Sequence, residues 1–355
     1  MTRTPAFPSR IRDRDRRVYG PRTTPVRLLW VAASVGPLHT GRMPVTAAVT
    51  AFITGADGFV GRALIKVLRS LDHQIFALAR SSDAAQRLSS AGATPVIGNL
   101  LESGGWQDEV AAHWVFHLPP YPQCRSRINL ARIKSLARKR VATDALLLDA
   151  LTRCAVRRIV YVADACCYGP TGPRPITEDT PPRPSRCGRC LMPALDRLDG
   201  YIVSGLPIVT ALPGLVYGNG GWFRQHVIEP VITGHRVIQF GYADRWISPI
   251  HVDDCARALV HLAEHGQPGR RYFLVNRDPV RMPEFAAAFA RLVNRPMRVW
   301  RVPAAASRLM VGPVLADYLR ADQIFSNIRL RGTGFHFEHP TLEHGLQQIV
   351  GAFHE

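Results

Sequence analysis

Three glycines, spaced three residues apart between a strand-like run and a helix-like run, constrain the fold of this chain more than any other feature. Residues 49–54 form an apolar run of strand length, and residues 60–70 repeat apolar side chains with a helical period. The segment between them reads Thr-Gly-Ala-Asp-Gly-Phe-Val-Gly. Gly55 permits a tight turn, Gly58 lets the backbone approach a pyrophosphate, and Gly61 allows close helix–strand packing, while the helix N-terminus attracts negative charge. The segment therefore predicts a dinucleotide-binding loop.

Strand-like and helix-like runs alternate after this loop, which is typical of an α/β fold with a parallel sheet and helices on both faces. We expect a doubly wound Rossmann domain over residues 43–218. A smaller C-terminal α/β lobe over residues 219–355 is expected to bind mainly substrate, with segments that return to the sheet. The expected strands cover residues 49–54, 74–79, 94–97, 114–118, 158–163, 207–212, 236–240 and 271–275. The expected helices cover residues 60–70, 84–91, 130–154, 190–204, 223–233, 254–264, 283–293 and 342–352.

Residues 1–42 differ from the rest, with no amphipathic period and nine arginines against Asp13 and Asp15. Three interpretations stay open: a targeting segment, a disordered tail, or a stretch upstream of a true start at Met43. We favour the second and third, because the apolar run inside the segment is short. No function is assigned to these residues.

The formal net charge of +18 raises the question of a nucleic-acid partner. Only three of the 45 basic residues are lysine, a skew typical of a GC-rich genome, and no basic stretch alternates with aromatic residues. We therefore expect neither nucleic acid as the main partner nor a membrane span, since no run approaches the roughly 18 apolar residues that a span needs. Seven cysteines without framework spacing favour free thiols in a reducing compartment, so we expect a cytoplasmic protein.

Further segments resemble the extended branch of the short-chain dehydrogenase/reductase superfamily, which contains nucleotide-sugar epimerases, dehydratases and related reductases. They are Val115-Phe116-His117-Leu118, Tyr168-Gly169, Leu215-Val216-Tyr217-Gly218 and His251-Val252-Asp253-Asp254. The resemblance covers nearly all of residues 46–350. It implies an NAD(P) cofactor and a small carbonyl or nucleotide-sugar-like substrate, and it leaves open a homodimer through the helices at 130–154 and 190–204. The implied cofactor contacts are Gly55, Gly58, Phe59, Val60, Gly61, Leu118, Val162 and Pro213, and the implied substrate contacts are Tyr168 and Arg245.

The end of the second expected strand bears on the choice between NADP and NAD. An acidic residue there would bind a ribose 2′-hydroxyl, whereas an arginine accommodates a 2′-phosphate. This chain has Ala79-Arg80-Ser81 at that point, so we expect Arg80 to favour NADP, with NAD as the alternative. Asn99 and Leu100 stand where relatives carry Asp-Leu beside the adenine, and they are expected to contact the cofactor.

The catalytic positions depart from the family pattern, in which Tyr-x-x-x-Lys supplies the acid/base and a Ser or Thr binds the substrate oxygen. Aligning the segments puts Asp164 at the Ser/Thr position, Cys187 at the tyrosine and Leu191 at the lysine. The sequence contains no lysine after Lys139, so no shift of alignment restores the pair.

Three interpretations follow from this departure. The protein binds the dinucleotide without redox chemistry, as a structural or regulatory subunit. Alternatively, Asp164, Cys187 and Lys139 replace the usual catalytic groups. In the third, water or the substrate supplies the proton for hydride transfer. We favour an enzyme, an NAD(P)-dependent oxidoreductase or epimerase/dehydratase-like protein.

The end of the strand at 158–163 faces the helix at 190–204 in this fold, so Cys166, Cys167, Cys187 and Cys190 are expected to converge. Cys187-x-x-Cys190 has redox-like or zinc-like spacing but lacks a second suitable pair, so no metal site is predicted. Buried thiols are the simpler interpretation. In His251-Val252-Asp253-Asp254, we expect one of the two aspartates to cap the following helix.

Overall fold

The computed structural model describes residues 48–119, 130–240, 244–313, 316, 319 and 321–352. All of them belong to one unit, which spans Ala47–Glu355. The three interpretations of residues 1–42 therefore concern a segment outside the described residues.

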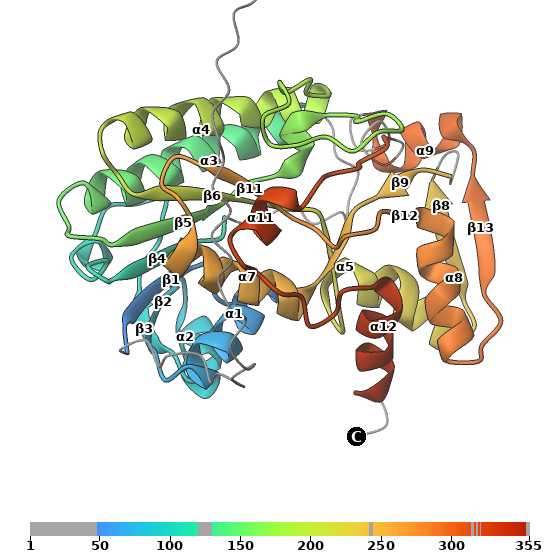
Figure 1. Ribbon diagram of the computed structural model, residues 1–355, viewed down its shortest axis with the longest axis horizontal. Helices are drawn as coiled ribbons and strands as arrows, with labels where there is room; N and C mark the ends of the chain where they lie inside the picture. Colours follow the sequence, from blue (N-terminus) through green and yellow to red (C-terminus); the bar gives the residue numbers. More distant parts are fainter. Residues whose placement is uncertain are drawn as a thin grey trace, which may run out of the picture. The chain divides into compact units, whose positions relative to one another are not determined.

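Within the described residues, seven strands form a central parallel sheet in the order β11-β6-β5-β4-β1-β2-β3 (Figure 1). The strand order reverses between β1 and β4, and open α/β sheets bind ligands outside the carboxyl ends of the strands at such a point. The strands are β1 (Thr50–Thr54), β2 (Gln74–Ala79), β3 (Thr94–Ile97), β4 (Trp114–His117), β5 (Arg158–Val162), β6 (Ile208–Pro213) and β11 (Arg271–Leu274).

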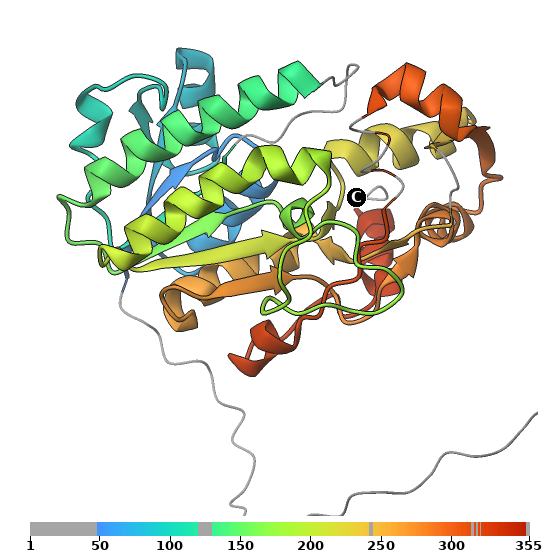
Figure 2. The same ribbon diagram turned by 90° about the horizontal axis from the view of Figure 1, so that it is seen from above.

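Helices cover both faces of this sheet. On one face lie α1 (Phe59–Ser70), α2 (Ser82–Ser90) and α7 (Val252–His265); on the other lie α3 (Leu130–Leu151) and α4 (Arg186–Val203), which run side by side in Figure 2. Successive side chains of β1 point to opposite faces of the sheet, as a sheet covered on both sides requires. Ala51 and Ile53 join the core under α1 and α7, whereas Phe52 joins the core under α3 and α4. The expected doubly wound α/β fold is confirmed. None of the helices in the described part of the chain is long and apolar enough to cross a membrane.

A third hydrophobic core lies in the C-terminal half, around Tyr217, Phe223, Phe285 and Phe289. The Tyr217 and Phe285 rings meet edge to face at 5.1 Å. The elements outside the central sheet include the short strand pairs β7 (Leu215–Tyr217) with β10 (Pro249–His251), β9 (Trp246–Ile247) with β12 (Val280–Arg281), and β8 (Arg236–Phe240) with β13 (Arg298–Val302). The helical segments are α5 (Gly221–Phe223), η3 (Arg224–Ile228), α6 (Glu229–Ile232), α8 (Met282–Leu292), α9 (Ala304–Val311), α11 (Ile328–Gly332) and α12 (Leu342–Gly351). The domain boundary at residue 218 stays a prediction.

One difference from the expected elements bears on the site. Helix α4 begins at Arg186, four residues before the expected start, because the Ser185 hydroxyl accepts a hydrogen bond from the backbone N–H of Gly188 and caps the helix. Cys187 therefore lies in the first turn of the helix rather than in the preceding loop.

Candidate functional site

The glycine loop leaves no room for side chains at two of its three glycines. Gly55 has φ +72°, and a Cβ built there would lie 2.0 Å from the carbonyl oxygen of Leu118. A Cβ on Gly61 would lie 2.5 Å from the carbonyl oxygens of Gly55 and Ala56. The N–H of Gly58 donates to the Gly55 carbonyl at 3.0 Å, which closes the turn. The loop thus packs directly on the end of β4, with Gly55 and Gly58 exposed.

The residues next to the loop are held by packing. The half-buried Phe59 ring lies against the 218–221 turn, since a Cβ on Gly220 would come within 2.8 Å of it. Val60 packs on the core under α1. Among the other expected cofactor contacts, Leu118 is buried, and Val162 and Pro213 are half-buried at the carboxyl ends of β5 and β6.

Three arginines surround Asp57, the acidic residue of the loop. Arg87 donates from Nε to Oδ1 at 3.2 Å and from its terminal nitrogen to Oδ2 at 2.6 Å. Arg62 donates to the Asp57 carbonyl oxygen at 2.8 Å. The hydrogen bond from Arg87, against the opposing effect of burial, lowers the pKa of Asp57, and the charges of Arg62 and of the exposed Arg80 act in the same direction. Three positive charges around one carboxylate leave this corner of the loop electropositive.

Asn99 and Leu100 follow β3. The Asn99 side chain accepts from the N–H of Leu101 at 3.1 Å and donates to Glu102 at 3.2 Å, so it orders the turn. Leu100 packs partly on the core under α3. Their expected contact with a cofactor stays a prediction.

A buried polar network, which the sequence did not lead us to expect, joins the ends of β1, β4 and β5. His117 is fully buried; its Nδ1 lies 2.6 Å from the Thr54 hydroxyl and its Nε2 lies 2.9 Å from Asp144 Oδ1. The Tyr161 hydroxyl donates to the other Asp144 oxygen. Burial by itself would raise the pKa of Asp144, but hydrogen bonding and charge from His117, with the charge of Arg140, lower it. The signal that could have found this network is the placement of a histidine and an aspartate inside otherwise buried runs.

The basic side chain that reaches this network is Arg140, not Lys139. Arg140 donates to the Tyr161 hydroxyl at 3.1 Å and to the carbonyl oxygen of Val162 at 2.8 Å. Lys139 is exposed on α3. Neighbouring residues on a helix point about 100° apart, so only one of the two can face the sheet. Lys139, one of the three expected replacements for the usual catalytic groups, does not reach this network, and its expected role stays a prediction.

Asp164 follows Ala163 just beyond the end of β5. It caps the short helix η2 (Ala165–Tyr168) by accepting a hydrogen bond from the N–H of Cys166 at 2.8 Å. Its second oxygen, Oδ2, is buried and finds no hydrogen-bond partner among the described residues. Hydrogen bonds with Cys167 and Cys187, followed by burial and the Asp164 charge, raise the pKa of the Cys166 thiol well above its usual value. Asp164 and Cys187 therefore both lie next to Cys166.

The expected convergence of thiols is confirmed for Cys166, Cys167 and Cys187. Cys190 lies one turn further along α4, where it neighbours Cys187 and contacts Ile133. Over the described ranges, the groups of three or more His, Cys, Asp or Glu ligand atoms that could hold a metal do not include these cysteines.

Tyr168 and Arg245 lie deeper than expected for substrate contacts. Tyr168 is 2% exposed, its hydroxyl donates to the Glu178 carbonyl at 2.9 Å, and its ring packs on Phe273 at 4.9 Å. The turn of η2 directs this ring into the core under α4, so these contacts do not support the expected substrate contact of Tyr168, which stays a prediction. Arg245 is buried beside β9, and its expected role stays a prediction.

The α7 helix is capped differently from expected. The His251 side chain, through Nδ1, accepts from the N–H of Asp253 at 3.3 Å and is the cap. Asp254 instead accepts from the backbone N–H groups of Glu338 and His339, each at 2.8 Å. The carboxylate thus anchors the segment before α12, and the expected aspartate cap is wrong.

Comparisons with known proteins agree with this fold. A model of the NAD dependent epimerase/dehydratase family matches residues 51–274. A 4-hydroxy-2-methyl-3-oxo-4-farnesyl-3,4-dihydroquinoline-1-oxide ketoreductase from Stigmatella aurantiaca is 24% identical over 266 residues, which cover 72% of this chain and 77% of that protein.

Two solved structures are similar in fold at low sequence identity. The crystal structure of human epimerase family protein SDR39U1 (isoform 2) with NADPH has a TM-score of 0.71 at 21% identity and covers 85% of this chain and 99% of that chain. MoeE5 in complex with UDP-glucuronic acid and NAD has a TM-score of 0.72 at 22% identity and covers 86% of this chain and 99% of that chain. Since the family model matches more than half of the 355 residues, this chain belongs to the NAD-dependent epimerase/dehydratase family.

Proposed function

We propose that the protein is an NADP(H)-dependent reductase of a small carbonyl compound. The observation that carries the cofactor choice is the cluster of Arg62, Arg80 and Arg87 around Asp57. A 2′-phosphate carries charge that an electropositive corner accommodates, and the corner lies where β2 ends beside the glycine loop. We assign Arg80 as the residue that principally contacts the 2′-phosphate, because Arg62 and Arg87 already bind Asp57.

The backbone geometry of the glycine loop also supports a bound dinucleotide. A Cβ at Gly55 or Gly61 would collide with backbone oxygens, and Gly55 and Gly58 expose their backbone at the N-terminus of α1. Backbone N–H groups at a helix N-terminus bind phosphate. When bound, NADPH would supply the hydride.

Asp164 and Cys187 are our candidates for the groups that act on the substrate oxygen. Both neighbour Cys166 beyond the carboxyl end of β5, and Cys187 is half-buried in the first turn of α4. Reduction of a carbonyl needs one proton delivered to oxygen, which a thiol can donate. Epimerisation of an alcohol first needs a base to remove a proton, and the family's Tyr-x-x-x-Lys for that task is absent here. Reduction is therefore the better-supported reaction.

A ketoreductase among the relatives supports the same reaction class. The NADPH in one similar structure and the NAD in another leave the cofactor to be tested directly.

The decisive experiment is a fluorescence titration of the full chain with NADPH and NADH, followed by NADPH oxidation over a panel of ketones, aldehydes and nucleotide sugars. We expect NADPH to bind in the micromolar range and NADH at least about tenfold more weakly. Equal binding would overturn the Arg80 assignment, and binding of neither would overturn the whole proposal. Tight NADPH binding without oxidation over the panel, even in single turnover, would instead favour a catalytically silent dinucleotide-binding protein.

A further inference from the structure

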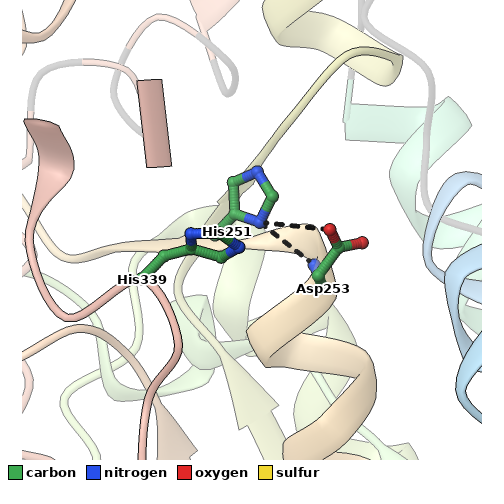
Figure 3. A group of neighbouring side chains, drawn as sticks. All are labelled: His251, Asp253 and His339. Carbon is green, nitrogen blue, oxygen red and sulfur yellow. Dashed lines mark hydrogen bonds and ion pairs between the residues drawn. The ribbon is translucent and has the colours of Figure 1, made fainter. Parts of the chain in front are cut away.

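A cluster of two histidines and one aspartate lies at the amino end of α7 (Figure 3). His251 ends β10, Asp253 lies in the first turn of α7, and His339 comes from the segment between α11 and α12. One ligand atom from each of the three lies within 4.8 Å of the others. His251 Nδ1 lies 3.8 Å from Asp253 Oδ2, and the two imidazole rings are 4.2 Å apart between centroids.

From this geometry we infer that His251, Asp253 and His339 bind a divalent transition-metal ion of the zinc class. Imidazole nitrogen and carboxylate oxygen are ligands that zinc takes, and three protein ligands with an open fourth position are typical of a zinc site that also holds water or substrate. The inference does not depend on the proposed reductase activity.

The positions of the ligands are fixed by contacts that need no metal. His251 is 1% exposed and its ring packs edge to face on Tyr217 at 5.3 Å. The segment that carries His339 is bound by the Asp254 carboxylate through two backbone N–H groups, each at 2.8 Å. Two elements 85 residues apart in sequence are therefore held together before any ion arrives, which lowers the cost of assembling the site.

The distances suit zinc after a small rearrangement. With metal–ligand bonds of about 2.0–2.1 Å, tetrahedral ligand atoms lie about 3.3 Å apart. The 3.8 Å between His251 Nδ1 and Asp253 Oδ2 already approaches this value. Asp253 and His339 are only half-buried, so rotation of these two side chains can close the remaining gap. Their exposure also gives an ion a path from solvent.

The competing use of His251 Nδ1 is weak. It accepts the Asp253 N–H at 3.3 Å, longer than a usual hydrogen bond. The Asp253 carboxylate supplies the negative charge of the proposed ligand set, because the neighbouring buried Asp254 carboxylate is already paired with Arg257 at 3.1 Å and with two backbone N–H groups.

The test is a Zn²⁺ titration of the untagged full chain, after chelator treatment, in competition with a chromophoric chelator. We expect one tight site in the wild type and at least about tenfold weaker binding in His339→Ala and in Asp253→Asn. Loss of groups that merely orient zinc ligands already weakens binding by about 10–100-fold, so loss of a ligand should cost no less. Both changes are at half-buried positions, and thermal unfolding without metal checks that the variants fold.

His265→Gln is the matched control. His265 forms a second histidine pair on α7 with His261, whose ring lies 4.5 Å away, and such a pair could chelate zinc by itself. Wild-type affinity in His265→Gln, with a tetrahedral Co²⁺ absorption spectrum that His339→Ala abolishes, would support the inference. Unchanged binding in His339→Ala and Asp253→Asn, loss of binding only in His265→Gln, or no saturable binding by the wild type would overturn it.

Discussion

His117 and Asp144 share a 2.9 Å hydrogen bond in the interior, between the end of β4 and the middle of α3. The carboxylate can only accept, so His117 Nε2 donates to Asp144, while Nδ1 on the other side of the ring lies 2.6 Å from the Thr54 hydroxyl. Thr54 directly precedes Gly55. The pair thus links the end of β1, which leads into the glycine loop, to α3, which covers the face of the sheet opposite to α1.

Asp144→Asn is expected to destabilise the protein by about 3 kcal/mol, since it removes one partner of a buried charged network. The amide would present a donor to a site now filled by donors from His117 and Tyr161. Asp149→Asn is the matched control: the same helix carries Asp149 exposed, where it accepts from the Tyr201 hydroxyl, and its loss should cost less than about 1 kcal/mol. Urea unfolding of both variants measures the difference, and equal losses would contradict the structural role of the network.

The same substitution should change how stability depends on pH. The folded-state pKa of Asp144 is lowered, so its contribution to stability is present above the unfolded pKa of about 4 and is lost as pH falls through the folded pKa. The stability gap between wild type and Asp144→Asn should therefore shrink as unfolding is measured from neutral pH down to below about pH 4. A gap that stays constant over this range would mean that folding does not shift the pKa of Asp144, and a gap that grows as the pH falls would mean that the folded protein holds this carboxyl un-ionised.

The parts of the fold that the sequence predicted are those whose signal is local. Gln74–Ala79, Thr94–Ile97 and Arg236–Phe240 have the expected bounds, because apolar runs bounded by turn residues define a strand. Strands as short as Trp246–Ile247 carry no period, and they form only because Val280–Arg281 pairs with them.

The candidate site likewise has features that the local sequence predicts and features that depend on contacts between distant residues. The glycine loop is contiguous, so its geometry follows from its sequence. Whether Arg140 or Lys139 faces the sheet depends on how α3 is rotated about its axis, and the packing that fixes this rotation involves residues distant in the sequence, such as Tyr161 and Val162. Tyr168 is directed into the core by contacts with Phe273 and Glu178, about 100 and ten residues away, and no local pattern reports such contacts.

Gly55→Ala should abolish dinucleotide binding and cost about 3 kcal/mol or more in stability. The new methyl group would meet both a left-handed backbone at φ +72° and the Leu118 carbonyl oxygen at 2.0 Å. Gly172→Ala separates the two effects: Gly172 has φ +69°, but its Cβ would meet no atom of the described chain within 4 Å. This control should cost only about 1–2 kcal/mol and leave NADPH binding intact. Similar losses in both variants would mean that backbone strain, not the close approach, makes glycine necessary.

Arg80→Ser should weaken NADPH binding by about tenfold and leave NADH binding unchanged, since it removes a charge-assisted hydrogen bond to the 2′-phosphate alone. Arg157→Ser is the control, because Arg157 is an exposed arginine at the opposite, amino-terminal end of β5. Parallel fluorescence titrations with both dinucleotides measure the effect. If Arg80→Ser weakens NADH and NADPH equally, the residue supports the loop rather than reading the phosphate.

Cys187→Ala should lower kcat for carbonyl reduction by about a hundredfold or more if this thiol donates the proton, the usual size of a general-acid contribution. Cys190→Ala is the matched control, since Cys190 is equally half-buried on the next turn of α4 and packs on Ile133 as Cys187 does, but it does not hydrogen-bond Cys166. It should retain kcat within about twofold. The comparison requires that both variants unfold at the wild-type temperature and bind NADPH with wild-type affinity. Equal kcat in the two variants would assign the proton to Asp164 or to water. Asp164→Asn, which keeps the side-chain shape that caps η2, then distinguishes these two sources, because only a proton from Asp164 would be lost in this variant.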